Sequence, residues 1–357
     1  MSSNGLNQEK VDAFTERIVG VLNNGALALM CSIGHRTGLF DTLAQIPPAT
    51  SAQIAAAAGL NERYVREWLN ALVSGQVVVY EPELATYHLP AEHAALLTRT
   101  AGADNLAIFS QHIGLLGGVE DQIIDCFHNG RGIPYTAFHR FHEVMAEDSN
   151  VNIVEPLIEQ ILPLVPGLTE KLEQGIDVLD LGCGRGNALK RLAQTFPHSR
   201  FYGIDFSEEA IATAQADVKR MELTNLRFAV QDAATFNESD RYDLICTFDA
   251  IHDQAYPARV LRNIARALKP DGIYLMQDIA ASSHVHHNLD HPLAPFLYTI
   301  STMHCMTVSL ASGGEGLGTM WGKEKALELL AGAGFAHTEV HQLPHDVFNY
   351  YYISKKS

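Results

Sequence analysis

The segment DVLDLGCGRGN, residues 177 to 187, runs a short apolar stretch directly into a glycine-rich turn. From about residue 165 onward, apolar strand-like segments alternate with helical ones, which predicts a parallel sheet with helices on both faces. A dinucleotide-binding turn has the spacing GxGxxG, but Asn187 stands where its third glycine would be, and Gly186 comes one residue early. The GxGxG spacing lets the backbone pass close under a ligand without seating a pyrophosphate on the following helix.

Carboxylates follow the next two predicted strands. FYGIDFS ends in Asp205, whose carboxylate suits two hydrogen bonds from ribose hydroxyls, although dinucleotide enzymes use the same device. RFAVQDAATF ends in Asp232, followed by Ala233, which suits the edge of an adenine ring. Helix capping is the alternative role for both carboxylates.

The last two predicted strands distinguish this sheet from a standard dinucleotide-binding sheet. After YDLICTFDAIHD and GIYLMQDI, the last two strands, near HTEVHQL and NYYYIS, are joined by a short connection. We therefore expect them to form an antiparallel hairpin at the sheet edge.

The first 95 residues predict a winged helix. Thr50 and Gln53 form a capping-box pattern, Gly59 ends that helix, and NERYVREWLNALV resumes with Val65, Trp68, Leu69 and Leu72 on one face. A hairpin follows through Glu81-Pro82-Glu83. The second helix of such a unit can enter the major groove of DNA, but Glu62 and Glu67 accompany its arginines and the wing is acidic. Dimerisation or substrate capping is therefore favoured over DNA binding.

Charge and cysteine content narrow the class further. The formal net charge is -16, which disfavours polyanionic partners and anionic membranes. The five cysteines are scattered and never spaced as CxxC, so neither a disulfide framework nor a zinc site is indicated. MSSNGLNQEK does not look like a leader, and we find no uninterrupted apolar run approaching about 18 residues. These features predict a cytoplasmic protein.

Taken in order, VLDLGCGRG, GIDFS, QDAATF, YDLICTFDAIHD and LKPDGIYLMQDI resemble the successive motifs of a class I S-adenosylmethionine-dependent methyltransferase. With the winged helix, the chain resembles small-molecule methyltransferases of mycobacterial type. The resemblance implies a Rossmann-like α/β sheet of seven strands in the order 3-2-1-4-5-7-6, with the seventh antiparallel. The expected domains are the winged helix over 1–95, a helical linker over 96–165, and a cofactor-binding domain over 166–357.

The resemblance also implies a set of residues for S-adenosyl-L-methionine. Tyr135, Phe138 and His142 of the linker are expected to roof the sulfonium, because aromatic faces attract cations, although ordinary helix packing is equally open. The expected cofactor residues are Asp180, Gly182, Gly184, Gly186, Asp205, Phe206, Asp232, Ala233, Phe248, Tyr135 and His142.

Catalytic candidates lie after the fourth strand of the sheet. His252 is the first candidate for a general base, with Asp253 beside it, and a capping or ribose-contacting role for His252 stays open. Residues from about 280 to 322 are expected to form a substrate lid, in which Met303, His304, Cys305 and Met306 face the acceptor and Trp321 is a fixed anchor at its end. The lid histidines raise the question of a metal, but no HExxH or CxxC order exists, and we expect none.

The sequence thus predicts methyl transfer to a small-molecule thiol, phenol or other hydroxyl, or heteroaromatic nitrogen, by in-line displacement. The family resemblance implies a homodimer, and we expect no nucleic-acid or membrane partner. The main alternative is a ligand-responsive DNA-binding regulator with a methyltransferase-like sensor domain. An NAD-dependent oxidoreductase is a weaker alternative, because Asn187 and the terminal hairpin count against it.

Overall fold

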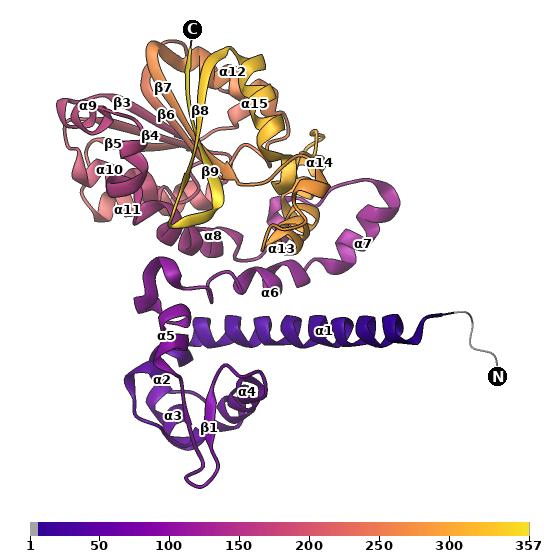
Figure 1. The fold of residues 1–357 in the computed structure, drawn as a ribbon. Helices are drawn as coiled ribbons and strands as arrows, with labels where there is room; N and C mark the ends of the chain where they lie inside the picture. Colours follow the sequence, from indigo (N-terminus) through magenta and orange to yellow (C-terminus); the bar gives the residue numbers. More distant parts are fainter. Residues whose placement is uncertain (1–5, 357) are drawn as a thin grey trace. The chain divides into compact units, whose positions relative to one another are not determined.

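The computed structural model describes residues 6–356. The first five residues of the segment MSSNGLNQEK lie outside this range. The chain forms two compact units, one ending at Gly117 and the other beginning at Gly118 (Figure 1). This division falls inside the range predicted as a helical linker. The first part of that range packs with the winged helix and the second part with the sheet.

In the first unit, a long helix precedes the winged helix. Helix α1 (Gln8–Thr37) begins at Asn7, whose side chain accepts a hydrogen bond from the Lys10 amide, and ends at Gly38 in the left-handed conformation. Helices α2 (Leu39–Gln45) to α5 (Ala91–Leu97) gather near its carboxyl end (Figure 1). By length and composition α1 would be able to cross a membrane, with a mean hydropathy of 1.4 over its best window.

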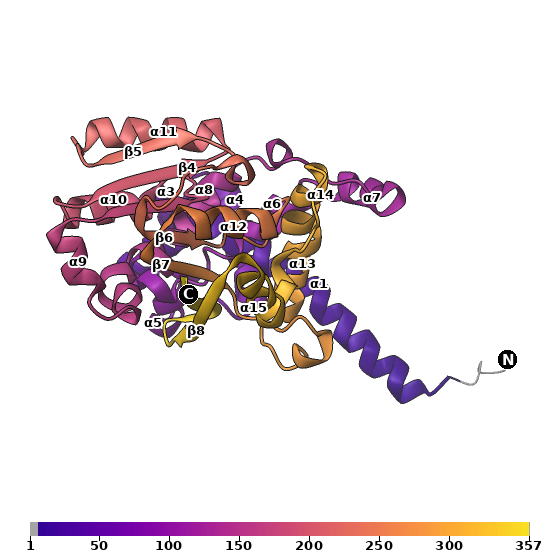
Figure 2. The same cartoon turned by 90° about the horizontal axis from the view of Figure 1, so that it is seen from above.

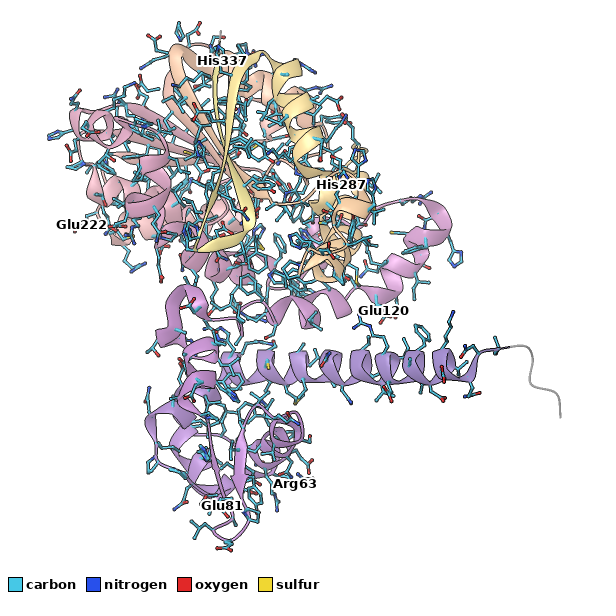
Figure 3. The ribbon with its side chains drawn as sticks, in the orientation of Figure 1. Arg63, Glu81, Glu120, Glu222, His287 and His337 are labelled. Carbon is cyan, nitrogen blue, oxygen red and sulfur yellow. The ribbon has the colours of Figure 1, made fainter. Side chains whose placement is uncertain are left out.

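The winged helix has the predicted parts. Helix α3 (Ser51–Ala58) starts with the complete capping box of Thr50 and Gln53, and α4 (Glu62–Ser74) buries the four predicted apolar residues. The wing consists of β1 (Val79–Glu81) and β2 (Thr86–His88). On α4, Arg63 and Arg66 form ion pairs with Glu67 and Glu62; Figure 3 labels Arg63 on this helix and Glu81 on the wing. The unit closes with the 3₁₀ helix η1 (Arg99–Asp104) and α6 (Gln111–Gly117).

The second unit begins with helices that lead to the sheet. In chain order they are α7 (Glu120–Asn129), η2 (Tyr135–Ala137), α8 (Phe141–Ser149), the π-helical turns η3 (Asn150–Val154) and η4 (Leu157–Ile161), η5 (Leu162–Leu164) and α9 (Leu168–Gln174).

The seven-stranded sheet has the order β5-β4-β3-β6-β7-β9-β8, which equals the predicted 3-2-1-4-5-7-6 when its strands are counted from one. The first five strands are parallel, and β9 runs antiparallel to both β7 and β8. The fold prediction and the terminal hairpin are therefore confirmed. The strands are β3 (Asp177–Leu181), β4 (Arg200–Asp205), β5 (Leu226–Val230), β6 (Tyr242–Phe248), β7 (Leu268–Ile279), β8 (Phe335–Leu343) and β9 (Asp346–Lys356).

Helices cover both faces of this sheet. Apolar residues of α10 (Asn187–Thr195) and α11 (Glu208–Arg220) share one core with Val178 and Leu244, while α12 (Pro257–Ala267) and α15 (Gly322–Ala333) share the other with Leu179 and Ile245. Figure 2 shows α11 running beside β5 at the sheet edge. Neighbouring strand residues alternate between the two cores, which explains why apolar residues follow one another directly at Val178 and Leu179 and at Leu244 and Ile245.

The range predicted as a lid is folded into short helices between β7 and α15. They are η7 (Val285–His287), α13 (Ala294–Ile300), η8 (Ser301–Cys305), α14 (Met306–Ala311) and η9 (Thr319–Trp321). The glycine-rich stretch after α14 packs against the segment after β6, because the Gly318 amide donates to the His252 carbonyl and the Glu315 amide to the Ala255 carbonyl. The segment that carries His252 is therefore held by main-chain hydrogen bonds.

A short connection, η6 (Ala233–Thr235), follows β5.

Candidate active site

The glycine turn after β3 forms the floor of a pocket at the carboxyl edge of the sheet. Gly182 has φ +78°, and a Cβ there would lie 2.6 Å from the Cβ of Ala250. Gly186 has φ +70°, and a Cβ there would lie 2.2 Å from the Phe228 ring. Both positions therefore need glycine for conformation and for space.

Two carboxylates of this floor differ in their hydrogen bonds. Asp205 accepts from the Gly184 amide at 2.9 Å and from the Ser207 amide at 2.8 Å. Asp180 is 2% exposed, and its Oδ1 has no donor among residues 6–356. Burial and the nearby Asp205 raise the pKa of Asp180 to about 8. A nearby cation would therefore stabilise the ionised form of the Asp180 carboxyl group in the pocket floor.

Aromatic side chains of the η2 and α8 region form one wall of the same pocket. The Tyr135 ring lies 4.9 Å from the Phe206 ring between centroids, and it is nearly parallel to the His142 ring at 6.3 Å. Its hydroxyl donates to Asp253. Phe141 lines this wall too and stacks on His304 at 4.0 Å between centroids. Of the three predicted roof residues, Tyr135 and His142 line the pocket, whereas Phe138 does not and packs against the His304 ring at 4.6 Å between centroids.

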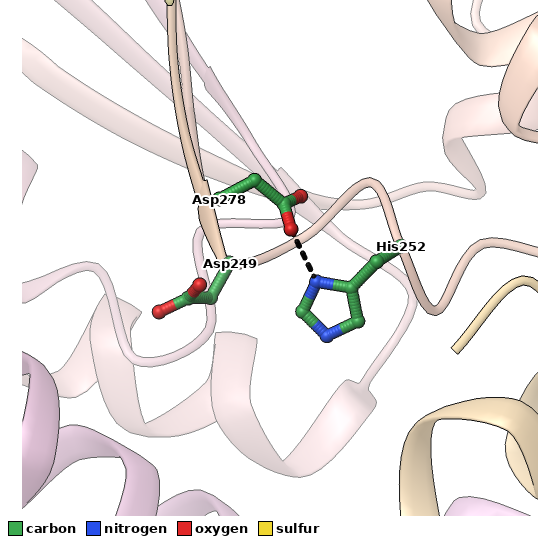
Figure 4. Close-up of side chains that lie close together, drawn as sticks. All are labelled: Asp249, His252 and Asp278. Carbon is green, nitrogen blue, oxygen red and sulfur yellow. Dashed lines mark hydrogen bonds and ion pairs between the residues drawn. The ribbon is translucent and has the colours of Figure 1, made fainter. Parts of the chain in front are cut away.

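His252 does not line the pocket itself; it is 4% exposed, in the turn after β6, between the lining residues Ala250 and Asp253. Its Nδ1 is 2.8 Å from Oδ1 of Asp278, at the end of β7 (Figure 4). The same oxygen accepts from the Trp321 indole N–H at 2.9 Å and from the Ile279 amide at 2.9 Å. Nδ1 thus faces the carboxylate, and the buried Cys305 is a second hydrogen-bond partner of the His252 side chain.

The charge state of His252 follows from two opposing causes. Burial lowers the pKa of His252, but Asp278 and Cys305 raise it, and the net pKa stands well above the usual value. The histidine is therefore a stronger base than a free imidazole.

Asp249 completes this end of the pocket. It has φ +49°, an uncommon conformation for a residue other than glycine, and Gln277 donates to its Oδ2 at 3.2 Å. Its Oδ1 is inaccessible to solvent and has no donor within the described range 6–356. Burial and Asp278 raise the pKa of Asp249 well above its usual range.

Most of the predicted cofactor residues meet in this one pocket. The predicted residues that line it are Tyr135, His142, Asp180, Gly182, Gly184, Gly186, Asp205, Phe206, Phe248 and Asp253. Asp232 and Ala233 do not line it. Asp232 accepts a hydrogen bond from the Ala234 amide and caps η6, so its adenine contact stays a prediction.

The predicted catalytic and acceptor-binding residues contact different partners. The neighbours His252 and Asp253 do not pair with each other, since His252 bonds Asp278 and Asp253 bonds Tyr135. His304 and Cys305 are buried, and Met303 is half-buried, in η8. Trp321 is an anchor, as expected, but its partner is Asp278. The acceptor-facing role of Met303, His304, Cys305 and Met306 stays a prediction.

Sequence reasoning missed Asp278, Asp249 and Phe141. Asp278 and Asp249 end or follow strands β7 and β6, so the rule that identified Asp205 would also have selected them. Phe141 carried no comparable signal, since only the fold brings α8 to the pocket.

The residues best placed to bind a metal are not the lid histidines. In the range 6–356, three or more potential ligand residues come together at Asp249, His252 and Asp278, whose ligand atoms lie within 4.8 Å of one another (Figure 4). The rings of His284, His286 and His287 do approach one another, but all three side chains are exposed. The expectation of a metal-free site stays a prediction.

The fold and this pocket define the class. Residues 172–334 match the model of a methyltransferase domain, and residues 25–99 match the model of an Rv2258c-like winged HTH domain. The chain therefore carries a winged HTH domain of the Rv2258c-like kind followed by a methyltransferase domain, and the family prediction is confirmed.

Known proteins agree with this assignment. Over 133 residues the chain is 31% identical to the malonyl-[acyl-carrier protein] O-methyltransferase of Bacillus cereus, which is 36% of this chain and 46% of that protein. The chain thus spans less than half the length of this curated relative.

Solved structures cover nearly the whole chain. An O-methyltransferase of provisional assignment from Nostoc punctiforme has a TM-score of 0.71 at 17% identity, covering 95% of this chain and 98% of that one. Human N-acetylserotonin methyltransferase, in complex with S-adenosylmethionine, has a TM-score of 0.69 at 19% identity and covers 100% of both chains. At this identity the likeness concerns the fold.

Proposed function

We propose that the chain is an S-adenosylmethionine-dependent methyltransferase acting on a small molecule. One observation carries this proposal: the methyltransferase-domain pocket lies directly beside a buried His252–Asp278 pair. A cofactor pocket alone would suit a sensor, whereas a buried base with a fixed carboxylate partner suits proton removal from an acceptor.

The residues present fit the cofactor. The turn at Gly182 and Gly186 keeps side chains out of the floor, and Asp205 offers a carboxylate that backbone amides already orient. Asp180, with its raised pKa, favours a positively charged ligand, because a cation would stabilise the ionised carboxylate. The Tyr135 and His142 rings give aromatic faces for the same charge.

When bound, S-adenosylmethionine supplies a methyl group on a positively charged sulfur, which is open to in-line attack. The protein aligns the acceptor and removes its proton. Asp278 holds the imidazole of His252 through Nδ1, so Nε2 would be the nitrogen that takes the proton of the acceptor, and the Trp321 indole holds Asp278. The burial of all three groups limits the access of water.

Two measurements test the proposal in sequence. Calorimetry should first detect S-adenosylmethionine binding to the purified protein, and a protein that binds no cofactor contradicts the proposal. Release of S-adenosylhomocysteine should then be measured over small thiols, phenols, amines and heteroaromatic nitrogens. Tight cofactor binding without turnover would favour the regulator alternative.

No feature of the winged helix supports that regulator. Its two arginines on α4 are neutralised by glutamates, and its wing is acidic. A mobility-shift assay with genomic fragments at low salt should show no sequence-selective retention.

We also propose that the protein is a cytoplasmic homodimer that uses α1. An apolar stripe at helical spacing stays exposed on this helix, and its members include Val11, Phe14, Ile18, Leu22, Leu29 and Ile33. Light scattering should give twice the monomer mass, and Phe14→Glu with Leu22→Glu should give a monomer. Retention of the wild-type protein on neutral vesicles would instead indicate a membrane partner.

A further inference from the structure

His252, the base of the proposed reaction, is covered by part of the lid. This part, residues 294 to 311, comprises α13, η8 and α14 and is called the cover segment below. Cys305 of η8 is a hydrogen-bond partner of the His252 side chain, whose Nδ1 already faces Asp278. His252 is 4% and Cys305 6% exposed, and neither is among the residues that line the pocket. An acceptor in the pocket therefore does not reach the imidazole while η8 keeps this position.

Aromatic contacts hold η8 against the pocket wall. The ring of His304 stacks on Phe141 at 4.0 Å between centroids. It also meets the rings of Phe138 and Tyr135 edge to face, at 4.6 Å and 5.1 Å. Neighbouring residues of one turn thus have two tasks, since Cys305 covers His252 and His304 packs against the wall.

The cover segment is packed less extensively than the sheet that carries His252. Leu297 of α13 belongs to a cluster of four buried apolar residues, whereas the two cores of the sheet are far larger. The turn η8 is a π-helix, a rare form that occurs mostly at functional positions. Segments with few buried apolar contacts open at a lower free-energy cost than the core.

The glycine-rich stretch after the cover segment separates it from a fixed point. Gly313 and Gly316 have φ of +69° and +64°, the left-handed region that glycine adopts without strain. Beyond them, the Gly318 amide donates to the His252 carbonyl at 3.2 Å, and the Trp321 indole donates to Asp278. The chain after the glycines is therefore tied to the His252–Asp278 pair, and the glycines provide a hinge between this fixed end and the cover segment.

We propose that the cover segment is an inhibitory cover of His252 and opens as a unit to admit the acceptor. This inference rests on the proposed function, because it takes His252 as the base that the acceptor must reach. Opening breaks the contacts of His304 and Cys305, and it leaves the sheet, the His252–Asp278 pair and the cofactor residues in place. The imidazole and the Cys305 thiol become exposed together, since each covers the other in the closed form.

Cys305 reports this opening directly, because a buried thiol reacts with N-ethylmaleimide only while it is exposed. The reaction should be followed by peptide mass spectrometry on the full chain without cofactor or acceptor, so that the result depends on no methyl transfer. Cys246 is the internal reference, a 2% exposed residue of β6 in a core of the sheet. Cys305 should react at least about 100-fold faster than Cys246. Equal rates would mean that Cys305 becomes exposed only on unfolding, which overturns the inference.

Phe138→Leu tests the closing contact, because Phe138 packs on His304 and does not line the pocket. Loss of one aromatic contact should raise the modification rate of Cys305 by about two- to tenfold. Phe196→Leu is the matched control, a buried phenylalanine in the same core as Cys246. It should accelerate the modification of Cys246 and leave that of Cys305 within about twofold. Equal acceleration of Cys305 by both variants would show that the cover segment does not open by itself.

Kinetics connect the opening to the reaction. For any acceptor of the small-molecule panel that turns over, kcat/KM should rise in Phe138→Leu by the same factor as the modification rate of Cys305, because the acceptor binds only the open form. Faster modification with unchanged or lower kcat/KM would show that the acceptor enters elsewhere, and would overturn the inference. Failure to bind any cofactor would contradict the proposed function instead, and the comparison of the two cysteines would still decide whether the cover segment opens.

Discussion

The functional side chains at the two ends of the pocket are held in place by different kinds of contact. At the cofactor end, Asp205 is oriented by one backbone amide of its own turn and one of the turn after β3, so its position follows from the parallel pairing of β3 with β4. At the acceptor end, Asp278, His252 and Trp321 come from three distant segments and hold one another by side-chain contacts. The difference suggests that cofactor binding and proton removal can be disturbed separately.

The largest expected effect lies at the acceptor end. His252→Ala should lower kcat by about 10²- to 10⁴-fold, because general-base catalysis contributes on this scale. Cofactor affinity should stay within about threefold. His252→Asn keeps a side-chain donor for Asp278 and should lose the same activity, which separates the loss of the base from the loss of the fold. An active His252→Asn protein would show that no base is needed.

The same histidine should set the pH dependence. A base works only when unprotonated, and its pKa stands well above the usual value, so the rate should rise with pH beyond the range of a free imidazole. The residual rate of His252→Asn should lose this rise. A wild-type profile that is flat above pH 6 would contradict the assignment.

Asp205→Ala should disturb the other end. We expect cofactor affinity to fall by about 10- to 100-fold, because the carboxylate can no longer accept hydrogen bonds from the cofactor. Asp232→Ala serves as the comparison, since Asp232 caps η6 outside the described pocket lining, and its effect should stay below about threefold. Titration calorimetry measures both. An equal loss in the two variants would restore the adenine contact predicted for Asp232.

Asp180 should couple cofactor binding to protons. Its pKa of about 8 means that the carboxyl is protonated near neutral pH, and a bound cation lowers that pKa, so binding should release a proton. Affinity should rise by up to roughly tenfold per pH unit between about pH 6 and 8. Calorimetry in buffers of different ionisation enthalpy counts the released proton, and Asp180→Asn should release none.

Trp321→Phe should have a smaller effect at the acceptor end. Loss of the indole N–H leaves Asp278 with one donor fewer, so kcat should fall by about three- to tenfold. The more negative Asp278 should raise the pKa of His252 further and move the pH–rate profile to higher pH. An unchanged profile with a lower kcat would mean that Trp321 has only a packing role.

The smallest effect is expected in the lid. Replacing His284, His286 and His287 together by alanine should change kcat/KM by less than about twofold, because all three side chains are exposed away from the described pocket lining. A larger loss, restored by added metal, would indicate a metal site there.

Local patterns predicted much of the fold and the cofactor end. Alternating strands and helices, the GxGxG turn and the carboxylate after β4 all lie within a few residues of the backbone features that cause them. The strand order and the antiparallel last strand came from the family resemblance, and the sheet confirms both. The same local reasoning misassigned no strand of the sheet, but it took Asp253 as the companion of His252.

By itself, the sequence determined where the strands end, and parallel strands bring their carboxyl ends to one edge, so Asp180, Asp205 and His252 were recognisable there. Only the tertiary structure decided that His252 pairs with Asp278, that Trp321 supports this pair, and that Phe141 reaches the pocket wall. These partners lie 26 and 43 residues apart from Asp278 along the chain. Their pairing depends on which strands are neighbours and which side chains are buried together, and the local periodicity of the sequence determines neither.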